Sequence, residues 1–274
     1  MHSTCSDGSE SPSSVIDLAV ESGCSTVALT DHDSLSGLRA ARTRAEEVGI
    51  NFINGCEVSC NDAHGTIHLL IYFVPVDGPF DDFLSEARED RTRRNAELVD
   101  KLGWLGMPID LEELAAEAGP GVVGRPHFAA LLVRHGHATS IADAFGRYLA
   151  DGGAAYVPRA ALAPATVIDR ARSAGAVVSL AHPHAIGLDR SVLSRYVRSL
   201  ADIGLVGLES IYGRYDPETR AALVELARGC GLVPTGGSDF HGTYKPDLSV
   251  GIGSGDLNVP DEIVDELFAR RTLS

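Results

Sequence analysis

The stretch that decides the fold is TVALTDHD at residues 26–33, in which a short apolar run ends in an acid–histidine–acid triplet. Similar apolar runs recur along the chain, at 50–53, 67–74, 176–180, 205–208 and 232–235. Amphipathic stretches lie between most of them and predict helices at 13–22, 36–48, 165–174, 191–203 and 217–228. Strands that alternate with helices indicate parallel βαβ units, and continuous apolar runs fit strands covered on both faces. We therefore predict an α/β fold.

Between residues 77 and 153 this rhythm changes, because strand-like runs give way to helical segments. Helices are predicted at 80–102, at 111–118, after Arg125-Pro126 with proline in the favoured first position, and at 141–149. The simplest interpretation is an all-helical insertion over 77–153, acting as a substrate cap, in a barrel formed by 1–76 and 154–274.

The composition limits the classes of function. Among 274 residues, 38 are acidic and 23 are Lys or Arg, which gives a net charge of −15. Such a chain is a poor candidate for an extended nucleic-acid surface, which depends on basic residues. No run approaches the roughly 18 apolar residues of a membrane span, and residues 1–12 lack the order of a signal peptide. We expect a cytoplasmic protein without a membrane partner. Five cysteines without a C-x-x-C pair indicate neither a disulfide framework nor a zinc ribbon.

Polar side chains collect where the apolar runs end, which is where parallel α/β folds place their chemistry. These residues are His32, Glu57, His182, His184, Glu209, Asp239 and His241, joined by His2 and Asp7 at the start of the chain and by His68. Imidazoles and carboxylates that converge favour a site for several divalent ions such as Mn, Fe or Zn, with a carboxylate bridging ions ~3.5–4 Å apart. Taken singly, the triplet at 31–33 could instead cap the helix near Ser34, and Glu57 could be a solvated loop acid.

Six motifs make the sequence resemble the PHP (polymerase and histidinol phosphatase) family of metal-dependent phosphoesterases. They are HSTCSDG at 2–8, ALTDHD at 28–33, GCEVS at 55–59, H-x-x-x-H at 64–68, LAHP at 180–183 and GSDFH at 237–241. The insertion resembles that of the subgroup acting on nucleoside 3′,5′-bisphosphates and the 5′ ends of short RNA. GRPHFA at 124–129 and YLxxGGxxYVP at 148–158 carry this closer similarity.

The resemblance implies a distorted barrel of seven strand–helix units that holds three divalent ions. It implies eight metal ligands in three groups: Asp7, His32 and His241; His68 and His182; and His2 and Asp239, with Glu57 bridging the second and third groups. Among these, Glu57, Asp239 and His241 would take the catalytic roles. His64 and His184 match no ligand position and are interpreted as supporting or surface residues.

The sequence departs from the family pattern at its start. The family motif begins His-x-His after an apolar strand, whereas this chain begins Met1-His2. We therefore expect the first strand and the first histidine to be missing. One ion would then have one imidazole fewer, and the neighbouring strands would have unpaired edges.

The leading hypothesis is hydrolysis of phosphate monoesters on a small nucleotide or short oligoribonucleotide by a metal-bridging hydroxide. Arg125 offers a planar fork for phosphate, and His127 lies in the first turn of a helix whose amides favour anions. Gly119–Gly124 would let the backbone approach the substrate. Alternatively, Arg125 pairs with an acid and His127 caps its helix. The cluster Arg91, Arg93 and Arg94 is either a solvated helix face or a guide for a second phosphate.

Three other functions remain open. A C–N hydrolase of the amidohydrolase type would use a carboxylated lysine, but neither Lys101 nor Lys245 is expected at a strand end. A histidinol-phosphate-type phosphatase would share the metal site but not the long insertion. A metal- or nucleotide-binding PHP protein with weakened catalysis would fit the missing histidine.

Overall fold

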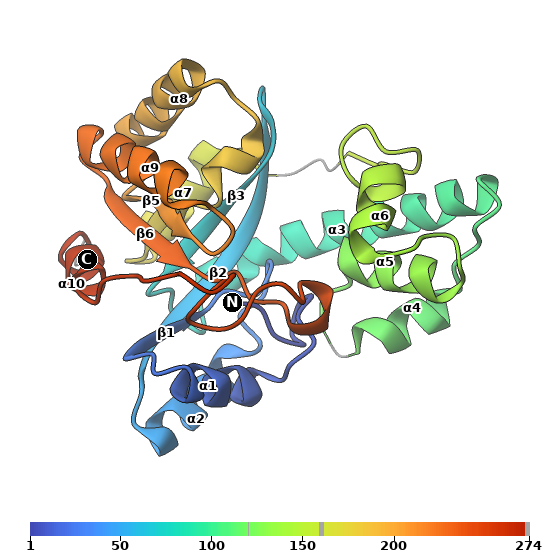
Figure 1. Cartoon of the computed structure of the whole chain (residues 1–274), viewed down its shortest axis with the longest axis horizontal. Coiled ribbons are helices and arrows are strands. Elements are labelled where there is room, and N and C mark those ends of the chain that lie inside the picture. The colour runs from blue at the N-terminus through green and yellow to red at the C-terminus, as the bar shows by residue number, and fades with distance from the viewer. Residues whose placement is uncertain (120, 159–161, 272–274) are drawn as a thin grey trace.

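The computed structural model describes residues 1–119, 121–158 and 162–271, and in them a mixed sheet curves into a half-barrel surrounded by helices (Figure 1). The sheet has six strands, which lie side by side in chain order. They are β1 (Thr26–Leu29), β2 (Asn51–Asp62), β3 (Gly65–Tyr72), β4 (Val177–Leu180), β5 (Gly207–Tyr212) and β6 (Val233–Gly237). The prediction of an α/β fold is confirmed.

The strand directions differ in part from those predicted. β1 pairs with β2 in parallel, and β4, β5 and β6 are parallel to one another. β3 is antiparallel to both β2 and β4, so the prediction of parallel units throughout is wrong here. The physical reason is the connection between β2 and β3, a turn at residues 63–64 that is too short for a parallel crossover.

β2 continues well past the apolar run at 50–53 that predicted it. Cys56, Val58 and Cys60 are buried in the main core, while Glu57 and Ser59 alternate with them and are buried as polar residues. Alternate residues of a strand point to opposite faces of its sheet. The sequence analysis expected Glu57 in a loop after a strand end. It projects instead from the middle of a strand.

Helices cover the outside of the half-barrel. They are α1 (Pro12–Glu21), α2 (Leu38–Val48), α7 (Pro164–Ser173), α8 (Arg190–Asp202), α9 (Pro217–Gly229) and α10 (Glu262–Ala269), with short 3₁₀ turns at Pro183–Ile186 and Gly242–Tyr244. Apolar residues of these helices, such as Ile16, Ile168 and Val197, join those of the strands in one core.

The sheet remains open between β1 and β6. In the described part of the chain, β1 pairs only with β2 and β6 only with β5, as expected for a barrel without its first strand. A cavity of about 520 Å³ lies along this opening. The start of the chain lies at this opening, since Thr30 N donates to Met1 O (2.8 Å) and His2 N donates to Phe240 O (2.9 Å).

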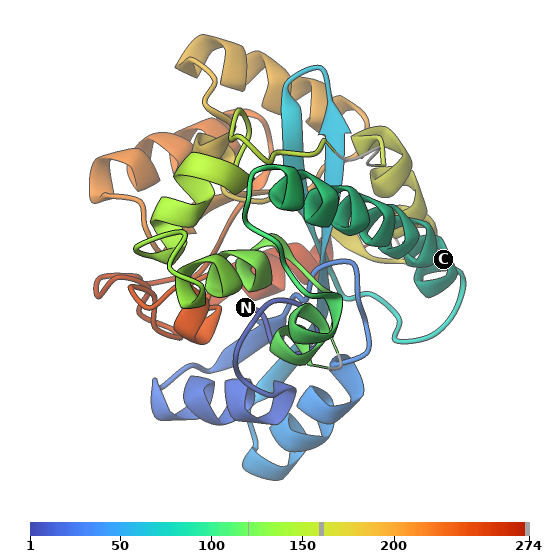
Figure 2. The same cartoon turned by 90° about the vertical axis from the view of Figure 1, so that its right-hand side faces the viewer.

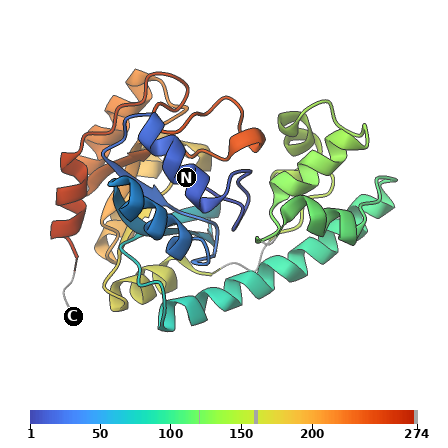
Figure 3. The same ribbon diagram turned by 90° about the horizontal axis from the view of Figure 1, so that it is seen from below.

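The segment 77–153 forms a cluster of helices beside the barrel, which we call the cap (Figure 2). Its elements are α3 (Pro79–Trp104), α4 (Leu111–Ala118), α5 (Arg125–Arg134) and α6 (Ile141–Ala144), which continues as a π-helical turn over Phe145–Leu149. The long helix α3 runs beneath both parts (Figure 3). Phe80 and Leu84 at its start join the barrel core, whereas Leu98 and Leu102 join a second core inside the cap.

Candidate metal centre

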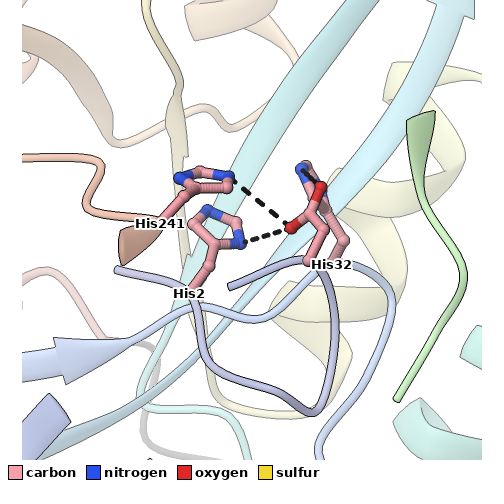
Figure 4. Close-up of side chains that lie close together, drawn as sticks. His2, His32 and His241 are labelled. Carbon is pink, nitrogen blue, oxygen red and sulfur yellow. Dashed lines mark ion pairs between the residues drawn. The ribbon is translucent and has the colours of Figure 1, made fainter. Parts of the chain in front are cut away.

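Asp7 lies at the centre of three imidazoles (Figure 4). Its Oδ1 is 3.4 Å from His2 Nδ1 and 3.5 Å from His241 Nε2, and its Oδ2 is 3.8 Å from His32 Nε2. All four residues are buried. These residues come from the first loop, from the loop after β1 and from the loop after β6, so three separate strand connections supply one cluster.

Glu57 links a second set of imidazoles to the first. Its Oε2 is 2.9 Å from His2 Nε2, and its Oε1 is 2.7 Å from His68 Nδ1 and 3.2 Å from His182 Nε2. The hairpin explains the contact with His68, because Glu57 is opposite Leu70 and Ser59 is opposite His68, which places Glu57 and His68 diagonally on one face. Burial opposes ionisation, but His32 and His68 hold the pKa of the Glu57 carboxyl well below its usual range.

Asp239 divides its two oxygens between different neighbours. Its Oδ1 is 3.4 Å from His2 Nε2 and 3.5 Å from His241 Nδ1. Its Oδ2 accepts hydrogen bonds from the Tyr212 hydroxyl (2.8 Å) and from Lys245 Nζ (2.5 Å). This carboxylate therefore faces the imidazoles with one oxygen and a phenol and an ammonium group with the other.

The eight residues that the family resemblance implies as ligands thus come together in space. Three groups of side chains can each surround an ion: His2, Asp7, His32 and His241; His32, Glu57 and His68; and His2, Glu57 and Asp239. His182 joins the second group through His68 Nδ1, 3.2 Å from its Nε2. The donors also fit a divalent ion chemically, because imidazole nitrogens and carboxylate oxygens are ligands that Mn, Fe and Zn accept.

The acidic residues on either side of His32 hold the site together rather than capping a helix near Ser34. Asp31 accepts hydrogen bonds from Ser3 N, Ser3 Oγ and Ser6 Oγ, each 2.7 Å long, and so fixes the loop that presents His2 and Asp7. A side chain on Gly8 would place its Cβ 2.3 Å from the backbone oxygen of His2, so only glycine lets this loop close.

Asp33 connects the metal cluster to the cap. Its Oδ2 accepts from Arg91 Nε at 3.1 Å and also from Arg91 Nη2, and its Oδ1 accepts from Ser59 N at 3.2 Å. Asp33 is fully buried and has a φ of 52°, a left-handed conformation that a carboxylate residue adopts at some cost. The interpretation of Arg91 as part of a solvated helix face is therefore wrong.

A cavity of about 170 Å³, which we call the cap cavity, lies between the metal cluster and the cap. Its walls combine cluster residues with four cationic and two aromatic side chains: Asp7, His32, His68 and His241; Arg91, Arg94, Arg125 and Lys245; and Phe145 and Tyr156. A cationic wall facing imidazoles and carboxylates is suited to an anion bound at a metal centre. Lys245, which the sequence analysis considered only as a carboxylated lysine and found unsuited to that role, is one of its residues.

The two residues expected to bind substrate differ in their surroundings. Arg125 lines the cap cavity, and its Nη1 donates to Leu149 O (3.2 Å) while its guanidinium lies 5.9 Å from the Phe145 ring. His127 uses its Nδ1 to accept the Gly124 N–H (3.0 Å), which matches the alternative that it caps its helix. Its substrate role stays a prediction.

Gly121 and Val122 approach protein rather than open space. A Cβ on Gly121 would lie 2.1 Å from Thr4 O, and Val122 N donates to Cys5 O at 3.2 Å. The close backbone approach that the glycines predict is thus made to the loop carrying His2 and Asp7. His64 and His184 are exposed, as expected for residues outside the cluster.

Residues 1–142 match the profile of the family described as "PHP domain". The chain belongs to the PHP family. A PHP relative, the 5′-3′ exoribonuclease Rnm of Escherichia coli (strain K12), is 34% identical over 243 residues, covering 88% of this chain and 83% of that protein. The 3′,5′-nucleoside bisphosphate phosphatase of Chromobacterium violaceum is 29% identical over 252 residues, covering 91% and 88%.

Solved structures agree with this family assignment. A Bifidobacterium adolescentis protein assigned as a metal-dependent phosphoesterase has a TM-score of 0.87 at 29% identity, covering 99% of this chain and 94% of that one. A Chromobacterium violaceum amidohydrolase, with bound sulfate and no metal, has a TM-score of 0.87 at 29% identity, covering 98% and 94%. The predictions of a PHP barrel and of a phosphoric ester hydrolase are confirmed.

No helix in the part of the chain that the structure describes has both the length and the apolar character needed to cross a membrane. The cytoplasmic location stays a prediction.

Proposed function

We propose that this PHP protein hydrolyses phosphate monoesters of nucleotides, with 3′,5′-bisphosphonucleosides and the 5′ ends of short RNA as its substrates. One observation carries the proposal. Asp7, beside three imidazoles, lines the cap cavity together with His32, His68 and His241, and the same cavity is lined by Arg91, Arg94 and Arg125. Glu57 and Asp239 adjoin this cluster through His2, and Glu57 also through His68. Such a site can hold cations on one side and a phosphate ester between them and the cap.

The metal side of the proposal consists of three divalent ions, chosen from Mn, Fe and Zn, held by the three groups of side chains. Their nitrogen and oxygen donors suit these metals. Such ions, when bound, lower the pKa of a coordinated water to supply hydroxide and neutralise charge on phosphoryl oxygens. Glu57 belongs to two of the three groups, so it is the side chain best placed to bridge ions.

The chain's own residues bind and orient the substrate. The planar guanidinium of Arg125 can donate two hydrogen bonds at once to two oxygens of a phosphate group. The cap cavity, at about 170 Å³, is smaller than the roughly 300–1,000 Å³ of pockets that enclose a whole ligand. We infer that it takes the phosphate end of the nucleotide and leaves the rest outside.

The relatives support the choice of substrate. One acts as a 5′-3′ exoribonuclease and another as a 3′,5′-nucleoside bisphosphate phosphatase. The Chromobacterium violaceum neighbour holds sulfate without metal, which is consistent with an oxyanion site in this architecture. The C–N hydrolase alternative needs a lysine between two ions, whereas here Glu57, which lies beside His2 and His68, would take the bridging role.

The test measures two products formed by the Mn-loaded protein: inorganic phosphate, which a phosphate monoester releases, and mononucleotides, which exoribonuclease cleavage of a trinucleotide releases. The substrates are adenosine 3′,5′-bisphosphate, a 5′-phosphorylated trinucleotide and histidinol phosphate. We expect turnover of both nucleotides well above that of histidinol phosphate, and a loss of about 10³-fold or more in kcat for Glu57→Gln. Equal rates for the wild-type protein and Glu57→Gln would show that the phosphate comes from a contaminant and would overturn the proposal. A clear preference for histidinol phosphate would replace the proposed substrate.

A further inference from the structure

Lys245 enters the site from a loop that is fixed at both sides. Thr243 N donates to Ser9 Oγ (3.1 Å) in the first loop of the barrel, and the Tyr244 hydroxyl donates to Glu117 Oε1 (2.9 Å) in the cap helix α4. The side chain of Lys245 is 26% exposed and lines the cap cavity. Its ammonium group is therefore held beside the cluster and remains open to the cavity.

The contact between Lys245 and Asp239 leaves the imidazole-facing oxygen of Asp239 in place. Lys245 Nζ binds Oδ2, whereas Oδ1 is the oxygen near His2 and His241. Lys245 can thus keep its hydrogen bond while Oδ1 serves the cluster. One acceptor uses only one of the three N–H donors of an ammonium group.

Two other cations of the cap cavity, Arg91 and Arg125, indicate what the remaining donors of Lys245 can bind. Arg91 is neutralised by the buried carboxylate of Asp33. Arg125 donates to a backbone carbonyl and lies over an aromatic ring, contacts that do not remove its positive charge. Lys245 and Arg125 therefore bring positive charge to the same small cavity, and a phosphoryl group is an anion that accepts hydrogen bonds from both.

We propose that Lys245 is a substrate-binding residue whose ammonium group donates at once to Asp239 Oδ2 and to an oxygen of the phosphoryl group being transferred. This inference rests on the proposed function, since it takes a phosphate ester as the substrate. It adds a contact on the Asp239 side of the phosphate, with Arg125 on the cap side. No bond to Lys245 forms or breaks.

A competing role is that Lys245 only orients Asp239, and Tyr212 provides the matched control. The Tyr212 hydroxyl donates to the same Oδ2 atom, yet Tyr212 is buried and absent from the described residues that line the cap cavity. If Lys245 acted only through Asp239, Tyr212→Phe and Lys245→Met would have similar consequences. If Lys245 touches phosphate, only Lys245→Met weakens phosphate binding.

The experiment measures binding of inorganic phosphate to the Mn-loaded protein by equilibrium dialysis, with metal content and Tm determined on the same samples. For Lys245→Met we expect the phosphate Kd to rise about tenfold or more, the size of a lost charged hydrogen bond, with metal content retained. Tyr212→Phe should stay within about twofold of the wild-type Kd. Arg93→Met, which removes one exposed positive charge from the cap, should also stay within about twofold.

Two results would overturn the inference: an unchanged phosphate Kd in Lys245→Met, or an equal rise in Lys245→Met and Tyr212→Phe. If Lys245→Met loses its metal, Lys245→Gln decides, because glutamine keeps a donor for Asp239 but lacks the charge. A weakened phosphate Kd in Lys245→Gln with metal retained supports the inference, and a wild-type Kd overturns it.

The same samples separate this inference from the proposed function. If the wild-type protein binds phosphate through Lys245 but releases none from any nucleotide, the proposed function fails and the role of Lys245 stands. If nucleotides are hydrolysed and phosphate binding does not depend on Lys245, the proposed function stands and the inference fails.

Discussion

The two walls of the cap cavity are built by different means. On the barrel side, the functional groups come from strands, from loops that follow strands and from the first loop of the chain, and Asp7, Glu57 and Asp239 each lie beside at least two imidazoles. On the cap side, guanidinium groups project from helices, and Arg125 contacts a backbone carbonyl and an aromatic ring. The difference indicates a division of tasks, because the rigid wall can fix ions and the helical wall can select the anion.

Two of the contacts between the walls lie next to residues of the metal cluster. One is the buried pair of Asp33 and Arg91, and the other is the hydrogen bond from Val122 N to Cys5 O. Because Asp33 follows His32 directly and Cys5 lies between His2 and Asp7, both contacts reach loops that carry cluster residues. Changes at these contacts should therefore affect both walls, whereas changes elsewhere should affect one.

The largest effect on stability is expected at the buried pair. Asp33→Asn leaves the Arg91 guanidinium buried without its counter-charge, and Arg91→Met does the same to Asp33. Each should lower the free energy of unfolding by about 3–5 kcal/mol, and the double variant should lose less than the sum of the two. Urea denaturation of the metal-free proteins measures these values.

The exposed pair of Arg190 and Glu225 is the matched control, because its side chains are 79% and 78% exposed. Arg190→Met should change the free energy of unfolding by only about 0–1 kcal/mol. Equal losses in the free energy of unfolding at the two pairs would show that the buried pair contributes no more to stability than an exposed one.

Arg125→Ala is expected to have a smaller effect, which concerns substrate binding on the cap side of the cavity and not the metal ligands. Loss of a charged hydrogen-bond donor to phosphate should lower kcat/KM for adenosine 3′,5′-bisphosphate by about 10–100-fold. Metal content should not change, since Arg125 belongs to none of the three ligand groups. Steady-state kinetics and elemental analysis check the two parts, and an unchanged kcat/KM would remove Arg125 from the phosphate site.

The smallest effect concerns the pH dependence of stability through His127. Burial lowers the pKa of His127 below its usual 6.5, and the ring accepts the Gly124 N–H through Nδ1. Above pH 6.5 the ring is neutral in both the folded and the unfolded chain, so its contribution to stability is fully present. Below pH 6.5 the unfolded chain binds a proton that the folded chain does not, and stability falls as pH drops toward the folded pKa.

His127→Gln should lack this loss. Between pH 6.5 and 5, the wild-type protein should lose up to about 1.4 kcal/mol per pH unit relative to the variant. Thermal melts of the metal-free proteins across this range measure the difference. Parallel curves for the two proteins would contradict the account of His127 as a neutral capping group.

The residues on the barrel side of the cap cavity could be predicted from the sequence far better than those on its cap side. Residues such as His32, His182 and Asp239 follow apolar runs directly, so the order of strands alone places them at one edge of the sheet. Glu57 lies within β2, but the sequence analysis expected it after a strand end. Polar residues alternate with apolar ones in the second half of β2, so that half was not recognised as a strand. The motif alone identified Glu57. The apolar run at 67–74 predicted β3, but the sequence analysis missed its antiparallel direction, which follows from the short turn at 63–64.

The cap wall depends on features that a linear pattern does not contain. The three arginines at 91, 93 and 94 look alike in sequence, yet only the packing of α3 decides that Arg91 and Arg94 are buried and that Arg93 is exposed. Lys245 reaches Asp239 only because its loop is tied to Ser9 and Glu117. The glycines at 119–124 do predict a close approach, but the partner is the loop at 4–5.

The most direct test of the central claim is the metal content of the purified chain after growth with Mn and Fe, determined by elemental analysis. We predict about three ions per chain for the wild-type protein and about one for Glu57→Gln, because Glu57 belongs to two of the three ligand groups. Arg125→Ala should retain the wild-type number. A wild-type chain without metal, or a Glu57→Gln variant with as many ions as the wild type, would contradict the assignment of this cluster as the metal centre.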